Sequence, residues 1–155
     1  MSEDVNSFFH GIQSLFSAKY HGRYLATILV EVGRQHPDCL IDFFSRTTAT
    51  AKRKFVAPRF ELEYTFKGAA GHRRRADVAV FANGDDLEPI LLVEIKYYDK
   101  PIEAQGIKPA QFEDYAAWVN SQKDKHFVAI CREQLKQMSK LAIVKPFVGV
   151  IWRAA

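Results

Sequence analysis

Two acidic residues and one lysine have the types and the spacing to do chemistry together. Asp77 lies near the start of the β-rich run 73–82, and Glu94 and Lys96 lie near the end of a second run, 88–98. An Asn-Gly-Asp-Asp turn signal separates the two runs, which predicts an antiparallel hairpin. In such a hairpin the start of the first strand neighbours the end of the second. Because Glu94 and Lys96 are two positions apart, both project from the same face of their strand.

The second run is apolar around its charged residues. Its aliphatic residues are Ile90, Leu91, Leu92, Val93 and Ile95. Apolar side chains at both odd and even positions predict a central strand that is buried on both faces. Charged groups in such a strand are costly unless they are paired or bind a metal ion. A buried salt bridge between Lys96 and one acid is the simplest interpretation, but the second acid, Asp77, favours a functional site.

A resemblance to a known family rests on seven residues that include Asp77, Glu94 and Lys96. They are Ala76-Asp77, Glu94-Ile95-Lys96, and Gln111 with Tyr115. The first five resemble the signature of the PD-(D/E)XK nuclease superfamily, with Ala76 in the place of the proline. The last two resemble the QxxxY element of the RecB-like branch of that superfamily. As a pattern of helices and strands, the resemblance covers roughly residues 24–131.

The resemblance implies an α/β fold with a restriction-endonuclease-like αβββαβ core, in which helices flank a mixed central sheet. It also implies a nuclease that uses Mg²⁺, or Mn²⁺ in its place, to hydrolyse phosphodiester bonds, with DNA as the expected substrate. Asp77 and Glu94 would hold the metal, because Mg²⁺ prefers hard oxygen ligands. Lys96 would position or activate the attacking water and offset phosphate charge. The alternative is a catalytically inactive module of the same fold that binds nucleic acid or protein.

Gln111 and two further acids are candidates for the same site. Gln111 lies in the first turn of a predicted helix, 109–120, where its side chain and free backbone N–H groups can reach an anion. An ordinary capping or exposed glutamine is the alternative. Glu63 lies in the alternating run 60–66, just before the motif strand, and the resemblance makes it the preferred further metal ligand. The resemblance also makes Glu31 a candidate metal ligand, against the simpler interpretation of a solvated helix glutamate.

Basic residues flank the expected site. The chain has a formal net charge of +4, which favours a polyanionic partner. The loop after Lys96 leaves the site end of its strand, so it is expected to flank the substrate groove. The candidate nucleic-acid-binding residues are Arg73, Arg74, Arg75, Lys100, Lys108 and Tyr115. The alternative for the arginines is a solubilising role in an exposed turn.

The chain of 155 residues is expected to form one domain, with N-terminal helices in 1–46 and the catalytic core in 58–131. Helices are predicted at 2–18, 24–35, 37–44, 109–120 and 133–138, and strands at 60–66, 73–82, 88–98, 126–131 and 147–152. The amphipathic helix 2–18 packs on the domain or offers a surface for a second copy in a homodimer. Because the last strand is apolar, the chain could also be the front module of a longer protein.

The composition predicts a cytoplasmic protein without a membrane span. Hydrophobic residues make up 48% of the chain, and no run of them reaches the length of a membrane helix. The start, Met-Ser-Glu-Asp, lacks the features of a signal peptide. Cys39 and Cys131 fit no metal-binding spacing and are predicted to be buried thiols in a reducing compartment.

Overall fold

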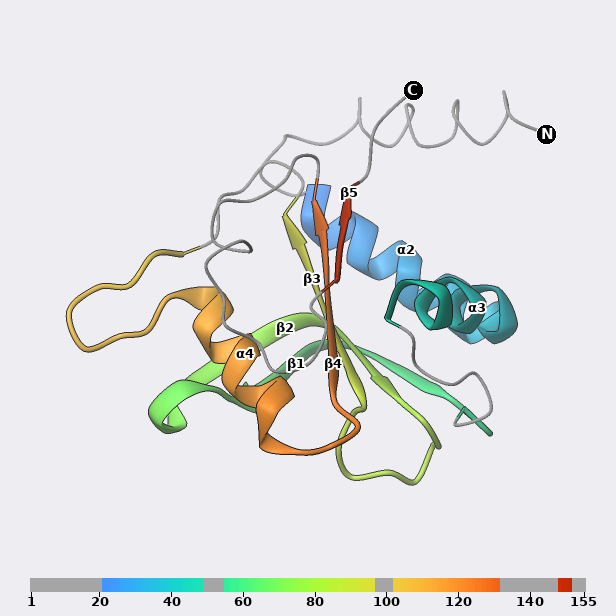
Figure 1. Ribbon diagram of the computed structural model, residues 1–155. Coiled ribbons are helices and arrows are strands. Elements are labelled where there is room, and N and C mark those ends of the chain that lie inside the picture. The colour runs from blue at the N-terminus through green and yellow to red at the C-terminus, as the bar shows by residue number, and fades with distance from the viewer. Residues whose placement is uncertain (1–20, 49–54, 97–101, 132–147, 152–155) are drawn as a thin grey trace.

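A five-stranded mixed sheet forms the centre of the computed structural model (Figure 1). The structure describes residues 21–48, 55–96, 102–131 and 148–151. The strands are β1 (Arg59–Lys67), β2 (Arg73–Phe81), β3 (Leu91–Lys96), β4 (His126–Cys131) and β5 (Val148–Ile151). They lie side by side in chain order, with β1, β2 and β3 antiparallel and β3, β4 and β5 parallel. The predicted hairpin and the predicted central position of the 88–98 strand are both confirmed.

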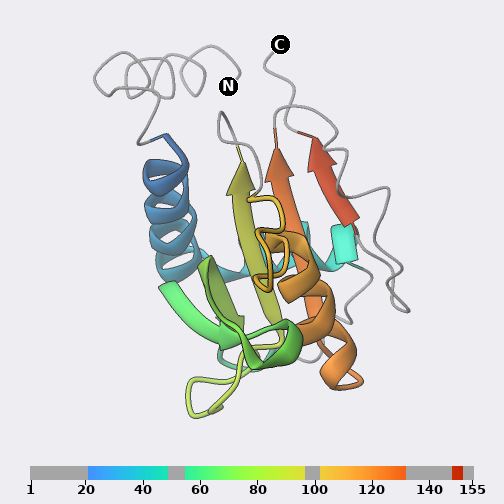
Figure 2. The ribbon, with the colours of Figure 1, turned by 90° about the vertical axis from the view of Figure 1, so that its left-hand side faces the viewer.

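Helices cover both faces of the sheet. They are α2 (His21–Gln35), α3 (Pro37–Thr48) and α4 (Gln111–Ser121), and a short 3-10 helix, η3 (Ala69–Gly71), joins β1 to β2. Figure 1 shows α2 and α3 on one side of the sheet and α4 on the other, and Figure 2 looks onto the α4 side. An α/β fold with a mixed sheet between helices is therefore confirmed.

The helix boundaries follow the sequence signals with small shifts. The helix predicted at 24–35 begins at His21, and the helix that Pro37 opens runs on to Thr48. The helix predicted from Pro109 begins at Gln111, because Ala110 is still extended and forms the N-cap. The helices predicted at 2–18 and 133–138 lie outside the described residues.

Two apolar cores lie on the two faces of the sheet. The core under α2 and α3 contains Val78, Val80, Leu91, Val93 and Ile95. The core under α4 contains Phe66, Leu92, Phe112, Tyr115 and Phe127. Successive residues of β3 thus alternate between the two cores, as a pleated strand requires. Glu94 therefore points into the α4 side, among residues that are otherwise apolar.

The strand β1 changes faces partway along its length. Phe60 packs in the core under α2 and α3, whereas Phe66 packs in the core under α4. An even number of positions separates them, so a regular strand would turn both side chains to one face. Glu63 lies between them with a φ of 56°, in the left-handed region that side chains other than glycine rarely adopt. The register of β1 and β2 places Glu63 opposite Asp77.

The strand β2 changes faces at the same place. Ala76 packs under α4, whereas Val78 packs under α2 and α3. Asp77 is the residue between them, so it marks the change of face in β2. As a consequence, Arg74 pairs with a residue of α4, whereas Arg75 pairs with Glu63 of β1.

Two observations bear on the expectations drawn from composition. Cys39 is exposed, so the prediction of a buried thiol is wrong for this residue. The buried residues of α3 are Leu40, Ile41 and Phe44, and Cys39 lies outside that stripe. The side chain of Cys131 is not described. In the described part of the chain, no helix is both long and apolar enough to cross a membrane.

Candidate active site

The pairing of β2 with β3 brings Asp77 to Glu94. The ladder pairs Val78 with Val93, and continuing this register by one residue places Asp77 level with Glu94. Oδ2 of Asp77 accepts a hydrogen bond from the backbone N–H of Ile95 at 2.7 Å. The Asp77 carboxyl thus partners a backbone group of β3 beside Glu94. Among the described residues, its second oxygen, Oδ1, has no hydrogen-bond donor.

Glu94 is almost completely buried, with 3% of its surface exposed, and its carboxylate accepts three hydrogen bonds. Nζ of Lys96 lies 2.8 Å from Oε1, and Nε2 of Gln111 donates to the same oxygen at 2.6 Å. The hydroxyl of Tyr115 donates to Oε2 at 2.5 Å. These donors compensate for the loss of water around a buried charge. A carboxylate has about four acceptor positions, so one remains for a further ligand.

Gln111 and Tyr115 reach Glu94 from one face of α4. They are four positions apart, which places them one above the other on a helix. Both are buried, and the ring of Tyr115 stacks on Phe127 with 4.1 Å between the ring centroids. Tyr115 was expected to contact nucleic acid, but its side chain has no exposed surface. Its role in this site is to orient Glu94.

Asp77 and Glu94 lie close together in a poorly solvated environment, which raises the pKa of Asp77. Burial, followed by the nearby charge of Glu94, raises the pKa of Asp77 from 3.8 to about 7. The N–H of Ile95 and the charge of Lys96 act in the opposite direction. Burial and the Glu94 carboxylate also hold the pKa of the Tyr115 hydroxyl well above its usual value, so this hydroxyl stays a donor.

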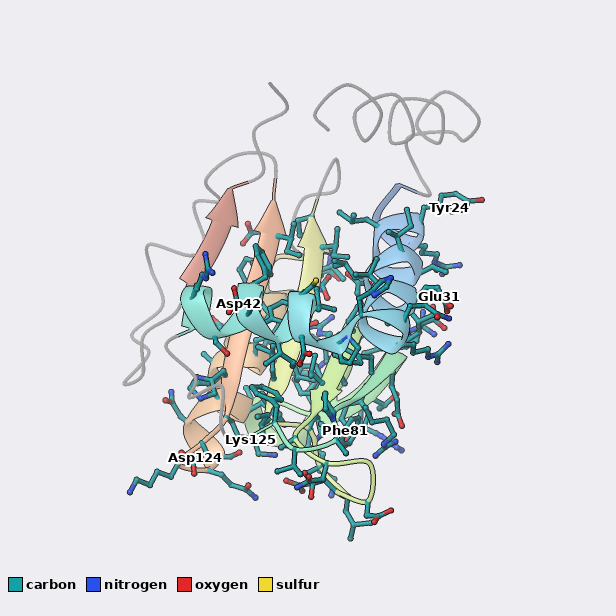
Figure 3. All side chains as sticks on the ribbon, turned by 90° about the vertical axis from the view of Figure 1, so that its right-hand side faces the viewer. Tyr24, Glu31, Asp42, Phe81, Asp124 and Lys125 are labelled. Carbon is teal, nitrogen blue, oxygen red and sulfur yellow. The ribbon has the colours of Figure 1, made fainter. Side chains whose placement is uncertain are left out.

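The two further candidate acids do not join this pair, although Glu63 lies opposite Asp77 in the register of β1 and β2. Glu63 is exposed, and its carboxylate lies 3.6 Å from Arg75. Glu31 points away from the sheet, as Figure 3 shows, and lies 3.9 Å from Arg34. Among the described residues, no three His, Cys, Asp or Glu side chains gather closely enough to share a metal ion. Asp77 and Glu94 are therefore the acids that the described structure brings together.

The candidate phosphate-binding residues differ in their surroundings. Arg74 is nearly buried and ion-paired, with Nη2 2.8 Å from Oδ2 of Asp114. Arg73 and Lys108 are exposed. Arg75 is also exposed and has only a 3.6 Å contact with Glu63, which leaves its guanidinium open to solvent. Lys100 lies outside the described residues.

Asp114 is a residue that the sequence did not single out. It is fully buried, and its carboxylate accepts hydrogen bonds from Ala69 N, His72 Nδ1 and Arg74 Nε at 2.9 to 3.0 Å. A Cβ at Gly68 would lie 2.4 Å from Asp114, so a glycine is needed there for this close approach. Asp114 therefore fastens α4 to the β1–β2 turn, one residue before Tyr115. The signal in the sequence that could have pointed to Asp114 was the basic run 72–75, because basic side chains that become buried need an acidic partner.

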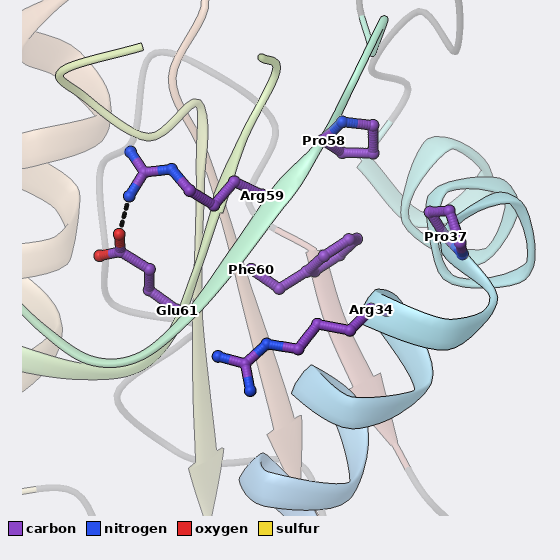
Figure 4. Close-up of a pocket in the computed structure, with 7 residues that line it drawn as sticks. Arg34, Pro37, Pro58, Arg59, Phe60 and Glu61 are labelled. Carbon is purple, nitrogen blue, oxygen red and sulfur yellow. Dashed lines mark ion pairs between the residues drawn. The ribbon is translucent and has the colours of Figure 1, made fainter. Parts of the chain in front are cut away.

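A cavity of about 390 Å³ lies away from this site, between α2 and β1 (Figure 4). It is lined by Gly33, Arg34, Pro37, Pro58, Arg59, Phe60 and Glu61. Figure 4 shows Arg59 and Glu61 paired with each other on one side of β1, while Phe60 points to the other side. The lining includes none of the candidate site residues, so this cavity is not part of the two-acid site.

Comparison with family models, with curated proteins and with solved structures gave no match for this chain. The resemblance to the PD-(D/E)XK superfamily therefore rests on the residues themselves and on the geometry described above.

Proposed function

We propose that this protein is a Mg²⁺-dependent nuclease of the PD-(D/E)XK type, built on a restriction-endonuclease-like core, with DNA as its substrate. One observation carries the proposal: the carboxyl of Asp77 accepts a hydrogen bond from the backbone N–H of Ile95, next to Glu94, and burial with the charge of Glu94 raises the pKa of Asp77 to about 7. A carboxyl group with a strongly raised pKa is typical of functional sites. An apolar residue or an asparagine would serve a purely structural purpose at lower cost.

The donor set fits Mg²⁺. Oδ1 of Asp77 and the remaining acceptor position of Glu94 are hard oxygens, and Mg²⁺ usually takes only one or two carboxylates and completes its shell with water and phosphate oxygens. A cation between the two acids would also relieve the repulsion that raises the pKa of Asp77. When bound, Mg²⁺ supplies Lewis acidity, activates water and neutralises charge on the phosphoryl group. Mn²⁺ has similar ligand preferences and is expected to substitute.

The protein's own groups would supply position and charge. The ammonium of Lys96 is held on Glu94 and retains donors that can orient a water or a phosphoryl oxygen. Gln111 and Tyr115 fix the Glu94 carboxylate, so that it does not have to reorient during the reaction. Three exposed cations are proposed to contact the phosphate backbone. They are Arg73 and Arg75 at the start of β2, and Lys108 in the loop between β3 and α4.

A second candidate function is a catalytically inactive module of the same fold that binds nucleic acid or protein. The observation that favours it is that three donors already contact the Glu94 carboxylate and balance this buried charge without a metal. The two functions differ in the behaviour of Asp77, because only the nuclease needs it ionised. Metal binding therefore separates them.

The test combines a cleavage assay with a metal titration. The parent chain, Asp77→Asn and Asp85→Asn are incubated with labelled DNA and with labelled RNA, each with Mg²⁺ and with EDTA. Asp85 is an exposed aspartate in the β2–β3 turn, so Asp85→Asn is the matched control. We expect Mg²⁺-dependent cleavage by the parent and by Asp85→Asn, and none by Asp77→Asn. Calorimetry that detects no Mg²⁺ binding, together with no cleavage of any substrate, would instead support the inactive module.

A further inference from the structure

A short hairpin, Ile102–Lys108, stands beside the candidate active site. Gln105 and Lys108 exchange two backbone hydrogen bonds of 3.0 Å, which closes a turn with Gly106 and Ile107 at its tip. Gly106 has a φ of 60°, as a two-residue hairpin turn of this kind requires. Every residue from Ile102 to Lys108 is exposed, and Figure 1 shows this loop extending away from the sheet on the α4 side, at the left of the view. The tip is thus held on a defined backbone that projects into solvent.

The foot of the hairpin is attached to the site. The backbone N–H of Gln111 donates to the carbonyl of Ile102 at 2.8 Å, and Oε1 of Gln111 accepts from the N–H of Ile102 at 3.2 Å. The same Gln111 side chain donates to Glu94 at 2.6 Å. One side chain therefore joins the hairpin to the buried acid. This connection fixes the hairpin relative to any substrate that lies over Asp77 and Glu94.

The tip carries an apolar side chain where turn chemistry calls for a polar one. Ile107 is fully exposed, and Ile102 at the foot is about half exposed. Such turn positions usually hold Gly, Asn, Asp or Ser, which satisfy the backbone or tolerate its geometry. Ile107 cannot hydrogen-bond the backbone in this way. An exposed aliphatic side chain contributes favourable free energy only when a ligand buries it. The neighbouring Lys108 adds an exposed positive charge.

We propose that this hairpin is a substrate-binding element in which Ile107 packs against an unstacked nucleobase and Lys108 contacts the adjoining phosphate. The proposal rests on the proposed function, because it takes nucleic acid to be the ligand of the neighbouring site. Aliphatic side chains on projecting elements wedge between bases, and the faces of all bases accept such contacts. An aliphatic side chain can reach a base face only where the base is unpaired or its stack is opened. The bases of a single strand are already open to such a contact, so the substrate class that we propose is DNA with a single-stranded segment.

The test measures binding separately from cleavage. Fluorescence anisotropy in EDTA records the affinity for a single-stranded DNA of about 12 nucleotides and for the duplex of the same sequence. The parent is compared with Ile107→Ser, Ile107→Leu and Leu87→Ser. Leu87 is nearly fully exposed in the β2–β3 turn, so Leu87→Ser removes an aliphatic side chain from a different turn and is the matched control. A second arm measures cleavage of both DNAs in Mg²⁺.

We expect Ile107→Ser to weaken single-strand binding about fivefold or more, with little change for the duplex. Ile107→Leu should retain most of the affinity, and Leu87→Ser should match the parent. The slope of binding against salt should stay the same, because no charge is removed.

Equal single-strand affinity for Ile107→Ser and Leu87→Ser would overturn the inference, even if the parent cleaves DNA. A parent that cleaves neither DNA but shows the Ile107 effect would refute the nuclease and keep the binding element. A parent that binds neither DNA would refute both.

Discussion

The hydroxyl of Tyr115 in α4 donates a 2.5 Å hydrogen bond to Glu94 in β3, and the two residues are 21 positions apart in the sequence. Gln111, one helical turn earlier, donates to the other oxygen of the same carboxylate at 2.6 Å. The buried acid of β3 is thus held by two side chains of α4, in addition to Lys96 of its own strand. The first consequence concerns the hydroxyl itself.

Tyr115→Phe should lower the free energy of unfolding by about 1–3 kcal/mol, because it leaves a buried carboxylate oxygen without its donor. The ring that stacks on Phe127 is retained, so packing should change little. The matched control is Tyr64→Phe, which removes a hydroxyl from a half-buried tyrosine on the same side of the sheet. Urea unfolding of the three proteins measures the difference. An equal loss in both variants would show that the Glu94 hydrogen bond is not responsible.

Asp77→Asn should change how stability depends on pH. The pKa of Asp77 is raised from 3.8 to about 7, so between these values the folded protein binds a proton that the unfolded chain has released. The stability that this proton contributes is therefore complete below about pH 4 and is lost as the pH rises to about 7. In EDTA, the free energy of unfolding of the parent should fall over this range relative to Asp77→Asn. Mg²⁺ should reduce that fall in the parent alone. Parallel curves of unfolding free energy against pH for the two proteins would contradict a raised pKa of Asp77.

Lys96→Met should lower the cleavage rate by about 10² or more, as for other groups that stabilise developing charge. Glu94 keeps its hydrogen bonds from Gln111 and Tyr115, so Mg²⁺ affinity should hold or tighten. Lys67→Met, at the exposed end of β1, is the matched control and should cleave like the parent. In a purely structural ion pair, breaking the contact should cost roughly 3–5 kcal/mol and Mg²⁺ should not restore the loss. Thermal unfolding together with a calorimetric Mg²⁺ titration distinguishes these outcomes.

Arg74→Ala and Arg75→Ala should have different effects, although the two arginines are adjacent. Arg74 neutralises the buried Asp114, so its removal should lower the free energy of unfolding by roughly 3–5 kcal/mol. Arg75 is exposed and loosely paired, so its removal should leave stability nearly unchanged. It should instead reduce the log–log salt slope of nucleic-acid binding by about 0.7–0.9. An unchanged slope for Arg75→Ala would return this arginine to a solubilising role.

The sequence predicted the elements of the sheet well, because their signals are local. Pro37 marks the start of α3, the Asn-Gly turn marks the hairpin, and the apolar run of β3 marks a strand buried on both faces. The meeting of Asp77, Glu94 and Lys96 follows from the hairpin and from a two-residue spacing. These inferences need only the period of a strand and the chemistry of a turn.

The surroundings of the site could not be predicted in the same way. The partnership of Arg74 with Asp114 depends on a change of strand face at Glu63, and nothing in the local pattern announces a left-handed residue there. The helical period placed Tyr115 on the inward face of its helix, but its hydrogen bond to Glu94 depends on how closely α4 packs on the sheet, which is a tertiary property. Glu31 and Glu63 were assigned from the resemblance, but both side chains are exposed and each carboxylate contacts an arginine instead of joining the acid pair.

The attachment of Glu94 to α4 also has a consequence for the order in which the protein folds. The strands β1, β2 and β3 are consecutive in the chain and pair through short connections, so they can form early. Until α4 docks, however, the Glu94 side chain lacks two of its donors and must stay hydrated. Dehydration of this carboxylate is therefore coupled to the docking of α4. A folding intermediate that contains only the β1–β2–β3 meander would hold its acids in water, where their repulsion is weak. The repulsion between Asp77 and Glu94 would become strong only when α4 docks.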